Sequence, residues 1–589
     1  MRETIKPHLV LLSAIAVGLS CGGAPSGQPP AGDHPNIVVI LADDQGWGDL
    51  SVHGNTNLST PNIDSLARDG ALFEHFYVCN VCAPTRAEFL TGRYSSRSDV
   101  RGVSTGQERL NLDEHTIAQT FKAAGYSTGA FGKWHNGTQH PYHPNARGFD
   151  EFYGFTEGHW GQYFDYELDH NGTLVRGEGF VIDDLTNHAI DFIEQNRDGQ
   201  FFAYLPFNTP HSPMQVPDEF WNRFESKELA LRNRDPDSED VPKTRAALAM
   251  VENIDWNVGR VLAKLDELNL ADNTIVLYFS DNGPNSWRWN GGMKGRKGTI
   301  DEGGLRVPFL IRWPGQIPAG HRVGKIAGAI DLLPTLADLA GISVKSEKPL
   351  DGKSIKPLLL GEVSDWPDRL IFSLRRQQVS VRNQRFRLDS EGQLFDIEAD
   401  PGQALDVTSQ NPQIAADLLE AASQWSAEVL PSVGPDDRPF PVGHSLTTLL
   451  PARDGIPHGG IERSARAPNC SFFTNWKSTD DSITWDIEVP SSGDYEAQIY
   501  YAAAEAGSTV ELSFNGASTS AKITEIHDPP LYGAADDRVP RGESEVKDFK
   551  PMSLGTIALA VGRAELKLRA TAISATEVAE IRYVALTRK

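Results

Sequence analysis

The sequence predicts an α/β domain built on a mostly parallel sheet flanked by helices, then a small antiparallel subdomain, then an all-β sandwich. From residue 35 to about 429, near-continuous apolar runs alternate with amphipathic helical patterns, which is typical of a parallel sheet covered on both faces. After residue 460 the apolar residues alternate at every second position between short turn sequences, which is typical of a sandwich.

Strands and helices can be assigned in order along the first region. The predicted strands are 36–41, 127–132, 201–207 and 274–280, and the predicted helices are 62–69, 114–124, 183–196 and 243–268. We assign 34–365 to the α/β domain. Short alternating segments from 370 to 396 and a helical pattern at 412–428 predict a small antiparallel sheet with a packing helix, which together form a subdomain at 366–430.

A stretch rich in proline and glycine follows. Its sequence is LPSVGPDDRPFPVGH at 430–444, with Pro451 and Pro457 beyond it, and it predicts a linker over 431–460 because dense prolines resist both helix and sheet. The sandwich then occupies 461–589 and is similar to carbohydrate-binding modules. Its aromatic residues are candidates either for stacking on sugar rings or for core packing: Trp476, Trp485, Tyr500 and Tyr501.

The amino-terminal residues resemble an export signal. Arg2 and Lys6 precede the apolar run LVLLSAIAVGLS, which is too short to remain as a membrane-spanning helix, so residues 1–20 are predicted to be removed. Cys21 and the flexible segment 21–33 resemble a bacterial lipoprotein signal with a lipidated cysteine and a tether. We expect an exported protein, periplasmic or at the cell surface and lipid-anchored through Cys21, with plain secretion as the alternative.

Charge and cysteine content exclude other classes. The chain has 55 basic and 79 acidic side chains, a net charge of -24, which disfavours nucleic acid as a partner. An anionic substrate therefore needs a concentrated basic site. Four cysteines are too few to form a disulfide framework in a chain of 589 residues.

Polar residues follow each predicted strand directly. The carboxyl ends of parallel strands meet at one edge of a sheet, where ligands bind, so these clusters are expected to converge. They are Asp43 and Asp44, Lys133 and His135, His211, and Asp281 and Asn282. The carboxylates and the amide offer only oxygen ligands, which favours calcium or magnesium over zinc. Taken singly, each cluster could instead be a cap, a turn or a loop residue.

Cys82 is the most specific feature of the sequence. It lies in CAPTRAEFLTG, where a helix is expected to begin near Pro84, so residue 82 would lie at a helix N-terminus that stabilises anions. From the residues alone, Cys82 is a candidate thiolate nucleophile beside Arg86, with a buried cysteine as the alternative.

The string CAPTRAEFLTG, read as C-x-P-x-R-x-x-x-x-T-G, resembles the signature of the sulfatase family. The strings LADDQGWGD, GKWH, TPHSP, SDNG and GRKGTIDEGG also resemble, in this order, those of the arylsulfatase-like branch. The resemblance covers about 35–430 and implies an alkaline-phosphatase-like α/β fold. It also implies that a formylglycine-generating enzyme oxidises Cys82 to formylglycine, and that calcium lies beside it, bound by Asp43, Asp44, Asp281 and Asn282.

The resemblance also implies roles for the basic residues. Arg86 would orient the modified residue, Lys133 would hydrogen-bond it, and His135 would act on its hydroxyl. His211 and Lys297 would contact the sulfate and the leaving oxygen. The implied reaction is hydrolysis of a sulfate monoester, on sulfated carbohydrate or an aryl sulfate, by the hydrate of formylglycine.

The chain departs from the family pattern at three positions. Thr85 stands where the signature usually has serine, Asn136 stands where an apolar residue is common and would alter the pocket rim, and Cys79 could in principle pair with Cys82. Two other functions are alternatives. One is a phosphate or phosphonate monoester hydrolase of the same superfamily, and the other is a surface glycan-binding protein with an inert hydrolase domain.

Overall fold

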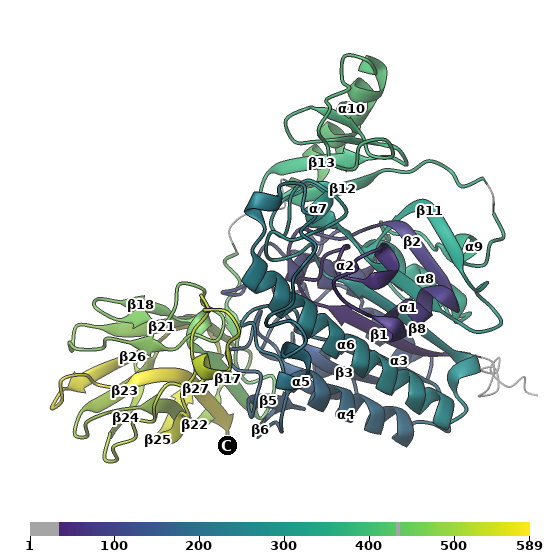
Figure 1. Cartoon of the computed structure of the whole chain (residues 1–589). Coiled ribbons are helices and arrows are strands. Elements are labelled where there is room, and N and C mark those ends of the chain that lie inside the picture. The colour runs from purple at the N-terminus through teal and green to yellow at the C-terminus, as the bar shows by residue number, and fades with distance from the viewer. Residues whose placement is uncertain (1–33, 364, 431–435) are drawn as a thin grey trace, which may run out of the picture.

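The computed structural model describes residues 34–363, 365–430 and 436–589, and it comprises three bodies (Figure 1). The large α/β domain carries the sandwich on one side and, at another end, the subdomain with α10 (Pro412–Val429). The expected export signal, the tether and Cys21 lie outside the described residues. Among the described residues, no helix is long and apolar enough to cross a membrane.

An eleven-stranded, mostly parallel sheet forms the α/β domain, as predicted. In spatial order its strands are β11 (His321–Gly328), β2 (Ala71–Tyr77), β10 (Phe309–Arg312), β8 (Thr274–Ser280), β1 (Asn36–Ala42), β7 (Phe201–Pro206), β3 (Ser127–Lys133), β4 (Glu151–Phe155), β5 (Glu167–His170) and β6 (Thr173–Arg176), and β9 (Arg306–Val307) pairs with β2. The strands from β8 to β4 are parallel, whereas β10 is antiparallel to both neighbours and β5–β6 is a hairpin at the edge.

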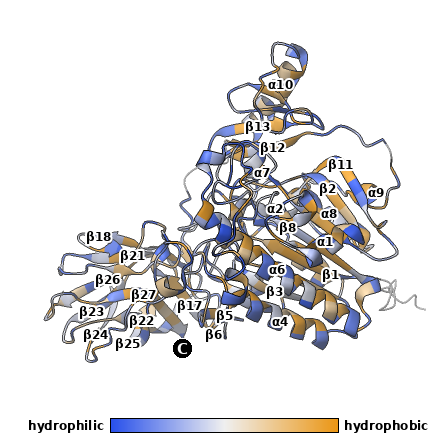
Figure 2. Ribbon diagram, in the orientation of Figure 1, coloured by the Kyte–Doolittle hydropathy of each residue, from blue (hydrophilic) through white to orange (hydrophobic). Residues whose placement is uncertain are grey.

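The central strands are apolar on both faces because both faces are covered. In β1, Val38 and Ile40 belong to one buried cluster, and Ile37 and Val39 belong to the other. Figure 2 shows the strands of this sheet mostly in orange, the colour of hydrophobic residues. This double burial is why these strands appear in the sequence as continuous apolar runs rather than as alternating ones.

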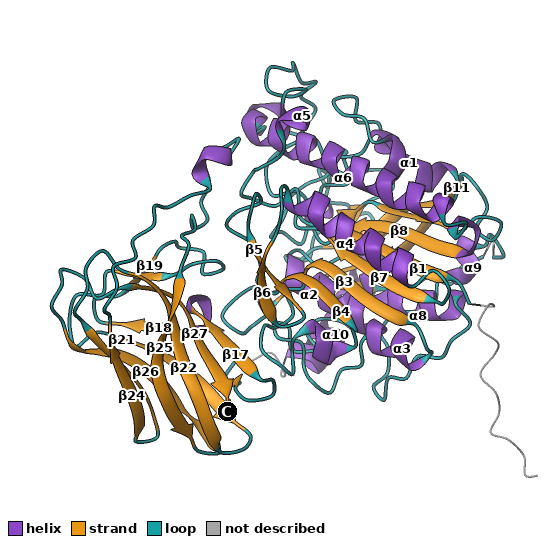
Figure 3. Cartoon of the chain, turned by 90° about the horizontal axis from the view of Figure 1, so that it is seen from below, coloured by secondary structure: helices purple, strands orange, loops and turns teal. Residues whose placement is uncertain are grey.

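Helices cover the two faces (Figure 3). One face is covered by α1 (Pro61–Arg68), α4 (Val181–Gln195) and α6 (Val241–Glu267), with α5 (Asp218–Trp221) packed on α6. The other face is covered by α2 (Cys82–Thr91), α3 (Ile117–Ala123), α8 (Leu332–Leu339) and α9 (Lys356–Leu359). The short helix α7 (Glu302–Leu305) precedes β9.

The subdomain is a four-stranded antiparallel sheet packed on one helix. Its strands are β12 (Ile371–Arg375), β13 (Gln378–Arg382), β14 (Phe386–Leu388) and β15 (Leu394–Asp396). Leu418 and Ala422 of α10 pack against Val381 and Leu388 of this sheet. The apolar positions of α10 recur at helical spacing, so one face of the helix can seal the sheet.

The sandwich consists of two six-stranded sheets. One sheet contains β16 (Phe440–Pro441), β21 (Ser482–Val489), β26 (Gly562–Ala572), β23 (Thr509–Phe514) and β24 (Ala517–Lys522), with β18 (Ile456–His458) paired to β21. The other contains β19 (Glu462–Arg463), β20 (Phe473–Thr474), β27 (Glu580–Arg588), β22 (Gly493–Ala502) and β25 (Lys550–Leu559), with β17 (Thr447–Pro451) paired to β27.

The linker prediction for the start of the sandwich needs correction, and the structure decides between the two uses that we considered for its aromatic residues. Strands β16, β17 and β18 lie inside the stretch that we predicted to be a linker. Each of these strands contains a proline: Pro441 ends β16, Pro451 ends β17 and Pro457 lies within β18. Proline is tolerated at the edge of a sheet because its missing N–H costs no ladder hydrogen bond there. In addition, Trp476, Trp485 and Tyr501 are buried in the core and cannot stack on a sugar, and only Tyr500 is half-buried.

Candidate functional site

Two acidic clusters meet where β1 and β8 end. Ala42, the last residue of β1, is in register with Ser280, the last residue of β8, so the residues that follow each strand are neighbours. The Asp44 amide donates a hydrogen bond to the Asp281 carboxylate over 3.2 Å. Asp44 adopts a left-handed conformation with φ 67°, which is costly for a residue other than glycine and is common at functional sites.

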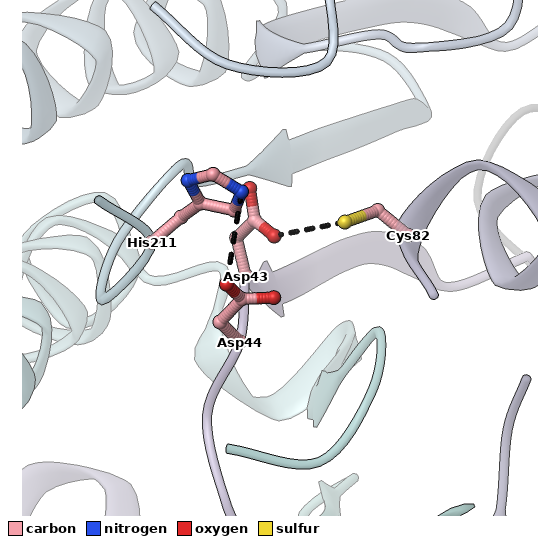
Figure 4. Close-up of side chains that lie close together, drawn as sticks. All are labelled: Asp43, Asp44, Cys82 and His211. Atoms are coloured by element: carbon pink, nitrogen blue, oxygen red, sulfur yellow. Dashed lines mark hydrogen bonds and ion pairs between the residues drawn. The ribbon is translucent and has the colours of Figure 1, made fainter. Parts of the chain in front are cut away.

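Cys82 faces this acidic pair from the N-terminus of α2. The helix begins at Cys82, directly after the extended residue Val81. The Cys82 thiol donates a hydrogen bond to Asp43 Oδ1 over 3.4 Å (Figure 4). In the same first turn, the Thr85 hydroxyl donates to the Asp281 carbonyl over 2.6 Å, so a threonine at this position fixes the helix to the end of β8.

Cationic side chains surround the carboxylates. Lys133 Nζ, at the end of β3, lies 2.6 Å from Asp43 Oδ2. Lys297 Nζ lies 2.5 Å from Asp44 Oδ1 and 3.6 Å from Cys82 Sγ. These contacts bring two lysines to the two aspartates that follow β1.

Arg86 and His211 also contact these carboxylates, whereas His135 does not. The Arg86 guanidinium lies 2.8 Å from Asp281 Oδ2 and also donates to the Lys133 carbonyl over 2.6 Å. His211 Nε2 lies 3.7 Å from Asp44 Oδ2 (Figure 4). His135 is the exception, because its Nε2 bonds to the Val103 carbonyl at 2.8 Å and it makes no direct bond to the other predicted residues.

The cations set the ionisation of the aspartates. Burial disfavours the charge of Asp43, but Lys133, His211 and Arg86 outweigh it and hold its pKa well below its usual range. Asp44 behaves in the same way, with Lys297 as the main opposing cation. Burial, together with the charge of Asp43, raises the pKa of Asp281 to about 7.

The unmodified thiol of Cys82 is a poor nucleophile. Burial raises its pKa, and the nearby carboxylates of Asp281 and Asp43 raise it further, so the thiol stays protonated at neutral pH. The thiolate interpretation of Cys82 therefore does not fit its surroundings. A residue that acts here must be activated in another way.

The residues present fit a hard divalent cation. Ligand atoms of Asp43, Asp44, Cys82 and His211 all lie within 4.8 Å of one another, whereas Asp281, which the sequence also assigned to the ion, is outside this cluster and pairs with Arg86. The Asn282 amide nitrogen donates to Asp44 over 2.8 Å, while its Oδ1 is buried with no hydrogen-bond partner. An unpaired buried oxygen beside buried carboxylates is the donor set that calcium or magnesium prefers.

The other departures from the family pattern have structural explanations. Cys79 and Cys82 are both free thiols, so the disulfide that we considered is absent from the described residues. Asn136 is fully buried and donates to the Ala83 and Glu108 carbonyls over 3.3 Å each. It therefore supports the first turn of α2 and does not form the pocket rim, contrary to our expectation.

The structure brings in residues that sequence reasoning missed. The His159 ring stacks on His211, with centroids 5.9 Å apart. The Ser212 hydroxyl donates to Glu543, which lies in the sandwich between β24 and β25. No local pattern marks Glu543, because it sits in the charged run RGESEVKD, which has the composition of a solvated surface loop.

Comparison with known families gives two matches. A model described as Sulfatase matches residues 35–342, and one described as N-sulphoglucosamine sulphohydrolase, C-terminal, matches residues 296–424. The chain is 34% identical to N-acetylgalactosamine-6-sulfatase of Canis lupus familiaris over 402 residues, covering 62% of this chain and 72% of that protein. It is 30% identical to steryl-sulfatase of Rattus norvegicus over 466 residues, covering 62% and 76%.

Solved structures show the same architecture. The crystal structure of Ps i-CgsB matches with a TM-score of 0.60 and 32% identity, covering 67% of this chain and 93% of that one. That protein has also been solved in complex with k-i-k-neocarrahexaose. Phosphonate monoester hydrolase of Agrobacterium radiobacter matches with a TM-score of 0.51 and 22% identity, covering 68% and 96%, a likeness that extends to the fold alone.

Proposed function

Because this chain belongs to the sulfatase family of sulfuric ester hydrolases, we propose that it releases sulfate from sulfated carbohydrate. The proposed reaction uses a calcium ion and a formylglycine that is formed from Cys82. One observation carries the proposal: Cys82 Sγ lies 3.4 Å from Asp43 and 3.6 Å from Lys297, between an acidic and a cationic group. Its inert thiol explains why the encoded cysteine would need conversion.

Four residues would hold the ion: Asp43, Asp44, Asp281 and Asn282. When bound, calcium would neutralise these buried carboxylates and polarise the sulfate oxygens. The all-oxygen set supports calcium, with magnesium as the alternative. The hydrate of formylglycine would supply a pair of hydroxyls on one carbon, which neither cysteine nor serine can offer.

The side chains of the site would then handle charge and protons. Burial disfavours the charge of Lys297, but Asp44 raises its pKa above the usual range, so Lys297 stays charged and can neutralise a sulfate oxygen. His211 Nδ1 donates to the Ser212 carbonyl at 2.6 Å, which leaves Nε2 to exchange a proton with the departing oxygen. His135 Nδ1 is buried without a partner and is available as a proton acceptor.

Relatives support a carbohydrate substrate. The relative with 34% identity is named for N-acetylgalactosamine 6-sulfate chemistry, and Ps i-CgsB has been crystallised with a neocarrahexaose. The export that the amino-terminal residues predict is consistent with a carbohydrate substrate, since sulfated polysaccharides occur outside cells. We therefore also propose that Cys21 is lipidated and anchors the enzyme. Metabolic labelling with a palmitate analogue tests this anchor, and a Cys21→Ala chain that still carries label would contradict it.

Mass spectrometry of the peptide that contains Cys82 tests the central proposal. Protein purified from its native host should carry formylglycine at residue 82, and the same preparation should release sulfate from sulfated oligosaccharides. Parallel assays of phosphate and phosphonate monoesters test the competing hydrolase. An unmodified thiol in fully active protein would refute the proposed nucleophile, and faster turnover of phosphonate esters would refute the proposed substrate class.

A further inference from the structure

A cavity of about 200 Å³ lies between the sandwich and the α/β domain. None of the residues predicted for the sulfate site lines it. In Figures 1 and 3 the hairpin of β5 and β6 lies beside the sandwich. Glu167 and Arg176, which pair with each other at the open end of this hairpin, line the cavity. Its wall is rich in aromatic side chains from both bodies: Trp160, Tyr166, Tyr500, Tyr532, Phe549 and Tyr583.

The cations in the wall, Arg176, Lys547 and Arg582, are already paired. Arg176 lies 3.0 Å from Asp548, which also accepts a hydrogen bond from the Tyr532 hydroxyl over 3.1 Å. Arg582 lies 3.4 Å from Glu157. The cavity therefore has no unpaired cation among these groups to attract a sulfate, and it combines aromatic faces with hydrogen-bonding groups. Sugar rings offer the matching surface, with an apolar C–H face and a rim of hydroxyls.

One loop separates this cavity from the sulfate site. His159 stacks on His211 on the side of the sulfate site, and the next residue, Trp160, lines the cavity. The Cys470 thiol of the sandwich, which also lines the cavity, donates to the His159 carbonyl over 3.1 Å and fixes this loop. Because the consecutive residues His159 and Trp160 contact the two sites, an oligosaccharide that filled both would pass around this loop.

We propose that the cavity binds an uncharged pyranose ring of a sulfated oligosaccharide, with Tyr500 as its stacking platform. The volume is smaller than the roughly 300–1,000 Å³ of sites that enclose drug-sized ligands, so it suits a single ring. This inference rests on the proposed carbohydrate substrate. It explains why a half-buried tyrosine of β22 faces the α/β domain across the cavity rather than the sandwich core.

Titration calorimetry on the Cys82→Ala background, which prevents turnover, tests the cavity. The probes are a neocarrahexaose, a chondroitin 6-sulfate hexasaccharide, and each of these after chemical desulfation. Tyr500→Ala should weaken binding by about tenfold, including binding of the desulfated form, because stacking is lost. Tyr500→Phe keeps the ring and should bind as before. Leu531→Ala, an exposed change in the loop next to Tyr532, is the matched control.

Kinetics on chains that retain Cys82 separate this inference from the proposed function. Tyr500→Ala should raise KM for hexasaccharides about tenfold and leave turnover of a small aryl sulfate unchanged. Hydrolysis or binding of the hexasaccharides that is identical in Tyr500→Ala, or no binding of any of them, overturns the cavity assignment. Binding that depends on Tyr500 without any hydrolysis would instead refute the proposed substrate and leave the cavity standing. Melting temperatures confirm that each variant is folded.

Discussion

The Ser212 hydroxyl donates a hydrogen bond to the carboxylate of Glu543, a residue 331 positions further along the chain. Ser212 directly follows His211, and Glu543 belongs to the sandwich, so the sandwich places a carboxylate beside the loop that carries His211. Burial opposes the charge of Glu543, but the hydrogen bond from Ser212, together with the neighbouring His211 and His159, holds its pKa below the usual range. The sandwich therefore contacts the residue next to His211 in the proposed site.

Replacing Glu543 tests this contact. Glu543→Ala removes both the acceptor for Ser212 and the charge beside the two histidines. A hydrogen bond to a charged group is worth about 1.5–3 kcal/mol, so kcat/KM should fall at least about tenfold. Glu545→Gln in the same loop is the control. Equal kcat/KM in the two variants with an aryl sulfate substrate would show that the contact is only structural.

Cys82 should be essential for turnover and nearly neutral for stability. Cys82→Ala removes the residue that would be converted, and it deletes a small side chain with two long, weak hydrogen bonds. We expect no detectable sulfate release and a melting temperature close to that of the parent protein. Cys82→Ser should also fail in steady state, because serine has one hydroxyl. Cys79→Ala is the control, and loss of activity there would shift the role to Cys79.

Two neighbouring lysines give a matched pair. Lys297 Nζ contacts Asp44 and Cys82, whereas Lys294 Nζ pairs with Asp301 at 3.6 Å, outside the proposed site, and its side chain is 41% exposed. Lys297→Ala should reduce kcat by on the order of 10²–10³, the usual effect of losing one donor to developing negative charge. Lys294→Ala should stay within about twofold. A reversed order in the measured kcat values would reassign the sulfate-binding lysine.

Metal removal should lower both activity and stability. A ligand present at 100 times its Kd stabilises the folded state by about 2.7 kcal/mol, so a chelator should lower Tm and added calcium should restore it. Asp44→Asn should weaken this response, because it removes one carboxylate from the site. Asp237→Asn, at an exposed acidic residue, is the control. A Tm that does not change on chelation in the parent protein would argue against a resident ion.

Glu88 should make stability depend on pH. Burial raises its pKa from 4.5 to about 7, so between these values the folded state holds a proton that the unfolded chain has lost. Its contribution to stability is present below pH 4.5 and is lost as pH rises through 7. Glu88→Gln should remove this loss.

The difference between Glu88→Gln and the parent protein should therefore grow with pH. Between pH 5 and pH 8, denaturant unfolding should show it increasing by on the order of 3 kcal/mol in favour of the variant. Exposed Glu362→Gln should show no such trend. A constant difference across this range would mean that Glu88 is already ionised in the folded protein.

The sequence alone determined the four adjacent strands β8, β1, β7 and β3 of the large sheet and most of the proposed catalytic groups. Continuous apolar runs such as 36–41 can be recognised as strands because a strand that is buried on both faces needs apolar side chains at nearly every position. The polar residues that follow β1 and β8 could be placed together because neighbouring parallel strands end at one edge of the sheet. These inferences depend on local pattern and one topological rule.

Tertiary packing decided which loops from distant parts of the chain meet. The sequence around Glu543 and Tyr500 gives no sign of their contacts with the α/β domain. Glu543 accepts a hydrogen bond from Ser212, and Tyr500 lines the cavity together with Trp160. Pro441 lies in a strand rather than a linker because an edge strand tolerates a missing N–H. Local patterns record burial and backbone preference, but the contacts between bodies depend on surfaces that exist only once each body has folded.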